Sequence, residues 1–208
     1  MSKGYEDMRL TAATVALAGI LWFATFYLAA GVFWYKIAAS AFILAGLSFV
    51  LQPARQFGFS FSLRSIWLGL ASAAILYLIF WAGKAVCTTV FPFAEQQVAG
   101  IYQQGQGTSI WVIVLLIFFV TSPCEELYWR GFLQRKLMQR FGGFRGWLLA
   151  ALLYAGVHIF SGNFILIGAA GVAGFFWGFM YWRLGDISVL IISHAVWSTF
   201  IFAVQPIP

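Results

Sequence analysis

The chain has 208 residues, of which 62% are hydrophobic and 9% are charged, and its mean hydropathy is +0.90. A water-soluble domain of this size needs far more polar residues on its surface, so the composition excludes one and predicts an all-α, polytopic transmembrane helical bundle. The net charge of +6 does not indicate nucleic-acid binding, because positive charge in membrane proteins usually marks cytoplasmic loops.

Seven apolar segments predict about seven membrane helices in a single integral-membrane domain that covers residues 1–208. Most segments reach the ~20 residues that a spanning helix needs. The segments are 10–31, 33–51, 65–91, 109–130, 146–160, 163–183 and 187–204. The first is expected to remain as a membrane helix rather than a cleaved signal, because acidic residues precede it and no small-residue cleavage site follows it.

The basic residues predict how the bundle is oriented. With the N-terminus in the cytoplasm, nine of them fall on the cytoplasmic side, namely Lys3, Arg9, Arg55, Arg64, Arg135, Lys136, Arg140, Arg145 and Arg183. The opposite side then holds Lys36 and Lys84 alone. This bias predicts a cytoplasmic N-terminus and a C-terminus on the other side of the membrane. The compact size is typical of a bacterial protein, so we expect the inner (plasma) membrane.

Five ionisable side chains fall inside the apolar segments, namely Glu125, Glu126, Arg130, His158 and His194. Each costs at least ~2.5 kcal/mol to insert, so each is a candidate for function. Glu126 and Arg130 are four residues apart and are expected to form an ion pair on one helix face. Glu125 points to another face and has no partner at helical spacing. Such a carboxyl in an apolar setting suits general acid or base chemistry.

The two histidines each have a polar neighbour at helical spacing. Tyr154 lies four residues before His158, and Ser198 lies four residues after His194. Each pair therefore presents two polar groups on one helix face. Together with an unpaired glutamate, these pairs favour a functional site over isolated buried hydrogen bonds.

Depth along the helices predicts that the three groups converge. If Gly142-Gly143 is the turn of a helical hairpin, Glu125 lies 17 residues before it and His158 lies 15 residues after it. At ~1.5 Å per residue these depths differ by only about 3 Å. His194 lies at the same depth in the membrane as Glu125 and His158 if the charged end of the fourth helix extends into the cytoplasm. The three side chains are therefore expected to meet below the cytoplasmic face.

Three short motifs carry a family resemblance. In chain order they are Glu125-Glu126-Leu-Tyr-Trp-Arg130, Tyr154-Ala-Gly-Val-His158 and His194-Ala-Val-Trp-Ser198. They resemble the motifs EExxxR, FxxxH and HxxxN of the CAAX protease and bacteriocin-processing (CPBP, Abi-type) family of intramembrane endopeptidases. The resemblance covers about residues 109–205, and the first three segments match nothing specific.

The resemblance implies glutamate-dependent hydrolysis of a peptide bond within the membrane. Glu125 would act as general base on a water molecule, and His158 would help to hold that water. His194 would donate a hydrogen bond to the oxyanion, and the residue at position 198 would add a second donor. The side chains expected to support these four catalytic residues are Glu126, Arg130 and Tyr154.

Two positions depart from the family pattern. Ser198 stands where the family has Asn, and its hydroxyl is a shorter and less directional donor than an amide. This departure leaves room for a slow enzyme, a different substrate, or an inactive member that acts as a membrane immunity or partner protein. Tyr154 stands where the family has Phe, and it can add a hydroxyl to the site.

The resemblance implies no cofactor, although two other chemistries remain open. Glu125, His158 and His194 offer one carboxylate and two imidazoles, which is a plausible set of ligands for a catalytic zinc ion. There is no HExxH motif, and the resemblance favours a metal-free mechanism. Cys124 is an alternative nucleophile, but no histidine lies at helical spacing to activate it.

The leading hypothesis is an endopeptidase that acts on a membrane-associated or C-terminally anchored protein or peptide in the lipid bilayer. The non-catalytic partner is the second hypothesis. A small transporter or proton relay that uses the same buried groups is the third. Against the third, the sequence shows no inverted repeat and no pair of broken helices.

Overall fold

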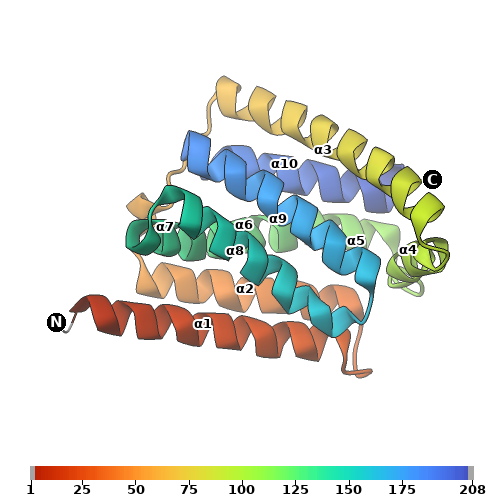
Figure 1. The fold of residues 1–208 in the computed structure, drawn as a ribbon, viewed down its shortest axis with the longest axis horizontal. Coiled ribbons are helices and arrows are strands. Elements are labelled where there is room, and N and C mark those ends of the chain that lie inside the picture. Colours follow the sequence, from red (N-terminus) through yellow and green to blue (C-terminus); the bar gives the residue numbers. More distant parts are fainter. Residues whose placement is uncertain (1–2, 206–208) are drawn as a thin grey trace.

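The computed structural model describes residues 3–205, and every regular element within that range is helical. Seven helical segments are long and apolar enough to cross a membrane, and each coincides with a predicted span. Figure 1 shows them running side by side, with the N- and C-termini at opposite ends of the bundle. The prediction of an all-α, polytopic bundle is therefore confirmed, and an odd number of crossings explains the separated termini.

Most of the spanning helices begin and end within a few residues of the predicted segments. The helices of the first half are α1 (Lys3–Phe26), α2 (Phe33–Leu51), the 3₁₀ turn η1 (Ala54–Gln56), α3 (Leu63–Val90) and α4 (Ala94–Gln103). The second half contains α5 (Ile110–Leu116), η2 (Ile117–Thr121), α6 (Ser122–Glu126), η3 (Leu127–Gln134), α7 (Arg135–Phe141), α8 (Gly143–Val157), η4 (His158–Ser161), α9 (Phe164–Leu184), α10 (Ile187–Thr199) and η5 (Phe200–Val204).

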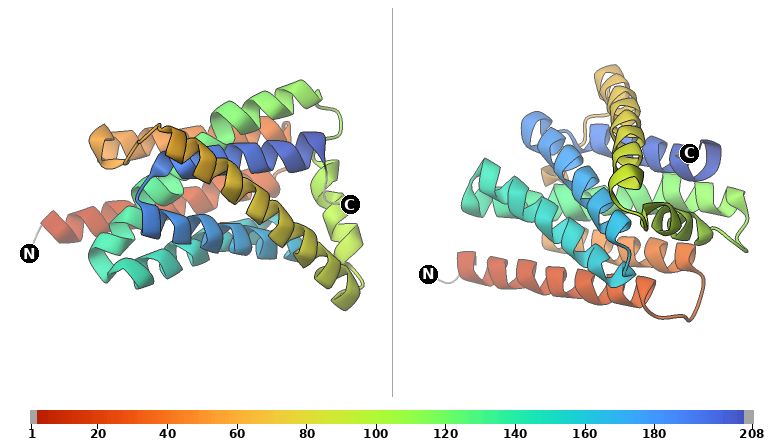
Figure 2. Two further views of the ribbon diagram at one scale, coloured as in Figure 1. Left: turned by 90° about the horizontal axis from the view of Figure 1, so that it is seen from above. Right: turned by 45° about the vertical axis from the view of Figure 1, so that its right-hand side comes forward.

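Helix α4 is an element that the sequence did not reveal. It is too short to cross a bilayer, and it packs against one end of the bundle near the C-terminus (Figure 2). Val98, Ile101 and Tyr102 recur at helical spacing and form its apolar face. Gln97 fastens it to the start of α9: its carbonyl oxygen accepts from Asn163 Nδ2 at 2.8 Å, and its Oε1 accepts from the Ile165 amide at 3.0 Å.

The fourth span is longer and less regular than predicted. The helix continues from Ile110 to Phe141, ten residues or so beyond the expected end, because its basic last turns extend out of the apolar layer. It widens into π-helical turns at η2 and η3, on either side of the short α6. Pro123 lies in α6 and has no amide hydrogen, so an ordinary turn cannot close there. The two adjacent glutamates thus sit between π-helical turns, a feature frequent at functional sites.

Helices α7 and α8 cross at unusually short range, and Gly146 makes this possible. A Cβ atom at Gly146 would lie 2.3 Å from the Met138 backbone nitrogen and 2.4 Å from its Cα. We therefore expect Gly146→Ala to force the two helices apart and to lower the free energy of unfolding by about 1–3 kcal/mol. Thermal unfolding of the purified protein in detergent measures this loss. Gly156→Ala is the matched control on α8, because no atom lies within 4 Å of its added methyl group.

Candidate active site

Glu125 lies at the centre of the bundle with one carboxylate oxygen engaged and the other free. Its side chain is 6% exposed. Tyr154 on α8 donates its hydroxyl hydrogen to Oε2 at 2.9 Å. Oε1 has no hydrogen-bond partner among residues 3–205 and belongs to a side chain that lines a cavity. The tyrosine hydroxyl that the sequence suggested for the site therefore orients this carboxylate, which keeps one oxygen available for a water molecule.

Glu126 forms the expected ion pair and has a second role that the sequence did not reveal. Its Oε1 accepts from Arg130 Nη1 at 2.9 Å and from His194 Nδ1 at 2.7 Å. All three side chains are buried, and the Arg130 guanidinium also lies over the rings of Tyr154 and Trp177 at 4.6 and 5.5 Å from their centroids. One glutamate oxygen therefore holds both the structural arginine and a candidate catalytic imidazole.

His194 is fixed in orientation by Glu126 and by ring stacking. Its imidazole lies on Trp177 with centroids 4.0 Å apart and an interplanar angle of 23°. Because Nδ1 bonds to Glu126, the ring presents Nε2 away from that carboxylate, and His194 lines a cavity on each side. Ser198 lies one turn later on α10, lines the first of these cavities, and makes no hydrogen bond to any described residue. His194, through its Nε2 edge, and the Ser198 hydroxyl thus line the same cavity from one helix.

His158 has protein partners at both ring nitrogens. Its Nδ1 bonds to the carbonyl oxygen of Tyr154 at 2.8 Å, and its Nε2 accepts from Trp22 Nε1 at 3.4 Å. A carbonyl only accepts and an indole only donates, so this network selects the neutral ring with hydrogen on Nδ1. Trp22 comes from α1, far outside the motif region, and no pattern in the sequence could have linked it to His158.

Trp22 therefore offers a test of how precisely His158 has to be held. Trp22→Phe keeps an aromatic ring but removes the donor to Nε2. We expect about a 10-fold fall in kcat with an unchanged KM, because a displaced group costs more in the transition state than in substrate binding. Steady-state peptide hydrolysis measures both constants. Trp129→Phe is the matched control, since the buried Trp129 Nε1 has no partner among the described residues. An equal loss in both variants would contradict a positioning role.

Thr121 and Ser122 are further polar residues that the sequence analysis missed. Both line the same cavity as Glu125, and the hydroxyl oxygen of each is buried with no partner among residues 3–205. The signal was present, because they lie four and three residues before Glu125 and so share its helix face. They add hydroxyl donors and acceptors to a site otherwise formed by one carboxylate and two imidazoles.

Two cavities meet at the histidines. The smaller has a volume of about 190 Å³ and is lined by Glu125, His158, His194 and Ser198 together with hydroxyl, amide, aromatic and aliphatic side chains. The larger has a volume of about 380 Å³ and is mostly apolar, with walls from α3, α4, α9 and α10. His158 and His194 line both. The four predicted catalytic side chains therefore line one cavity, here called the polar cavity, beside the larger and more apolar one.

The arrangement does not fit a zinc centre. Across the described part of the chain, no three His, Cys, Asp or Glu side chains are placed so that they could hold a metal ion. Both nitrogens of His158 already bond to protein groups, and a zinc ligand needs a free nitrogen lone pair. Glu125, His158 and His194 therefore do not offer three free ligand atoms to one zinc ion.

Comparison with known proteins matches this region to one family. Residues 107–200 match a family model described as type II CAAX prenyl endopeptidase Rce1-like. The matched range contains all three motifs, and it confirms the resemblance to the CAAX protease family. No curated protein and no solved structure matches the chain. Trp22 and helices α1 to α4, which complete the site, lie outside the matched range, although the end of the loop after α4 lies within it.

Proposed function

On the premise that residues 107–200 belong to the type II CAAX prenyl endopeptidase Rce1-like family, we propose that this integral-membrane protein is a glutamic intramembrane endopeptidase. It hydrolyses a peptide bond in a membrane-associated or C-terminally anchored protein or peptide. The observation that carries the proposal is the free Oε1 of Glu125 in a cavity that His194 and Ser198 also line.

In this mechanism Glu125 is the general base. Its Oε1 takes a proton from a water molecule while the oxygen of that water attacks the carbonyl carbon of the scissile peptide bond. Tyr154 holds Oε2, so the carboxylate keeps its direction during the transfer. When the C–N bond breaks, Glu125 returns the proton to the leaving amine. The products are a carboxylic acid and an amine, and the net change is the addition of one water.

His194 and Ser198 are the proposed donors to the oxyanion. Since Nδ1 already donates to Glu126, a second donation from Nε2 requires the imidazolium form. The imidazolium then lies between the Glu126 carboxylate and the developing negative oxygen, and both attract its charge. His158 contributes from the cavity wall, where Trp22 and the Tyr154 carbonyl oxygen hold its neutral ring in place beside the water.

The experiment that tests the proposal compares peptides released from membranes that carry the wild-type chain or Glu125→Ala. Mass spectrometry of new protein termini should find cleavages that depend on Glu125. Equal sets of termini in the two samples would contradict a protease. The same comparison separates the proposal from a non-catalytic immunity or partner protein, whose phenotype Glu125→Ala would leave unchanged.

Ser198 gives a graded test of the oxyanion site. Ser198→Ala should lower kcat about 10-fold because it removes a donor, and Ser198→Asn should match or exceed the wild type because an amide is the more directional donor. The cavity beside Ser198 has room for the larger side chain. Steady-state kinetics on the purified protein measure the order Asn, Ser, Ala. An order that follows side-chain volume instead would show that position 198 acts by packing.

A further inference from the structure

The polar cavity lies toward one particular end of the bundle. Its walls come from the last turn of α1 at Phe26, the first turn of α2 at Phe33, the end of α4 at Gln104, the turn before α9 at Asn163 and the end of the last span at Phe202. In Figure 1 all these segments lie at the end where the C-terminus is marked, opposite the N-terminus. The cavity that the catalytic side chains line therefore extends toward the end of the molecule that α4 covers.

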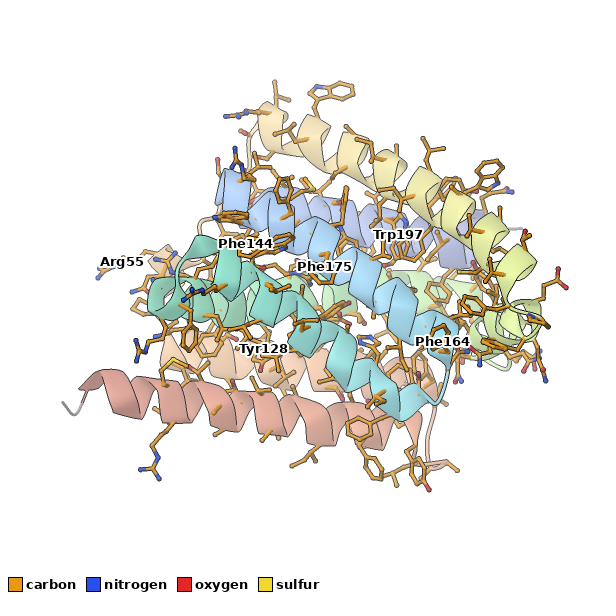
Figure 3. The ribbon with its side chains drawn as sticks, viewed as in Figure 1. Arg55, Tyr128, Phe144, Phe164, Phe175 and Trp197 are labelled. Carbon is orange, nitrogen blue, oxygen red and sulfur yellow. The ribbon has the colours of Figure 1, made fainter. Side chains whose placement is uncertain are left out.

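The opposite end carries the positive charge. Eight basic residues of the described chain belong to segments that begin or end there, namely Arg9, Arg55, Arg64, Arg135, Lys136, Arg140, Arg145 and Arg183. Figure 3 labels Arg55 at this end and Phe164 toward the other. The cavity end has Lys36 and Lys84 near it, and the covering segment 91–109 contains one charged residue, Glu95. A charge bias of this size places the basic end in the cytoplasm.

From these two observations we propose that the catalytic cavity opens to the non-cytoplasmic side of the membrane. The inference rests on the proposed protease function and adds to it the side from which the substrate arrives. The charge bias favours this orientation, in which the cavity extends toward the far face, whereas the sequence alone suggested convergence below the cytoplasmic face. Water reaches Glu125 from the outer side, past the exposed Gln104 and the partly exposed Asn163.

The apolar cavity defines the class of substrate. It lies at the same end of the bundle, between α3, α9 and α10, and it shares His158 and His194 with the polar cavity. One continuous occupant can therefore place an apolar segment in the larger cavity and an adjoining polar segment in the smaller. We infer that this occupant is a single-span membrane protein, which is cleaved where its membrane-spanning segment meets the non-cytoplasmic face of the membrane.

The orientation is tested by chemical labelling of single cysteines. Cys87→Ser and Cys124→Ser give a background to which Gln96→Cys on α4 or Gln139→Cys on α7 is added; both glutamines are exposed and uncharged, so the charge bias is kept. A membrane-impermeant maleimide should label position 96 in right-side-out vesicles and position 139 in inside-out vesicles. The reverse pattern overturns the proposal.

A second measurement keeps the test independent of the cysteine background. Alkaline phosphatase fused after Val204 should be active in intact cells, and green fluorescent protein fused there should be dark. The substrate class is tested by mapping the cleavages that depend on Glu125, which should fall in outer juxtamembrane segments of single-span proteins. Cleavages at cytoplasmic segments would overturn this inference and leave the protease assignment intact. An absence of any Glu125-dependent cleavage would overturn the proposed function itself.

Discussion

Glu125→Gln should lower kcat for peptide hydrolysis by about 10²–10⁴-fold while the protein remains folded. An amide has the size of the carboxylate and can still accept the hydrogen bond from Tyr154, but it cannot take a proton from water. The ion pair of Glu126 with Arg130 is untouched, so the bundle keeps its main buried charge contact. Single-turnover cleavage of a reporter peptide in detergent or nanodiscs measures the rate, and thermal unfolding checks the fold.

Cys124→Ser is the matched control, because it changes the neighbouring residue on the same short helix. We expect it to retain activity, since Cys124 has no histidine partner and acts as a packed side chain in this site. A large loss in Cys124→Ser with little loss in Glu125→Gln would contradict the glutamate mechanism and favour the cysteine nucleophile.

Arg130→Met should destabilise the folded protein by about 3–5 kcal/mol. Arg130 is 2% exposed and neutralises a carboxylate that is fully buried, so its loss leaves the charge of Glu126 without its main partner. The variant also loses the cation–π contacts over Tyr154 and Trp177. The free energy of unfolding, measured in detergent micelles against a denaturing detergent, reports the change.

A double variant separates stability from catalysis in this network. Glu126→Leu with Arg130→Met removes both charges, and it should recover much of the lost stability because packed apolar groups replace a buried pair. It should not recover activity, since His194 Nδ1 then has no carboxylate to fix it. Recovery of both properties together would show that Glu126 does not position His194.

The spacing of polar residues along single helices predicted much of the site, because several site residues lie one helical turn apart in the sequence. The Glu126–Arg130 pair and the relation of Tyr154 to His158 follow from the i, i+4 rule, which needs no knowledge of the tertiary fold. The seven spans follow equally from segment length and hydropathy. In each case one helix contains all the information that the prediction requires.

Contacts between helices could not be predicted in the same way. Whether Trp22 meets His158, or Glu126 meets His194, depends on how helices far apart in the chain rotate and cross. Helix α4 was missed because a segment that contains Pro92, five glutamines and several glycines has neither the length nor the hydropathy of a span. The purpose of its apolar face can be recognised only in the tertiary structure, where that face covers the larger cavity.

The attachment of α4 to α9 contrasts with the charged pair at the centre of the bundle. Gln97 joins the two helices through an amide oxygen and a carbonyl oxygen, and its partners Asn163 and Ile165 are neutral as well. No titration alters these two bonds, and dissolved ions screen them little. The two hydrogen bonds that hold α4 over the cavity should therefore keep their strength on a side of the membrane where pH and salt concentration vary.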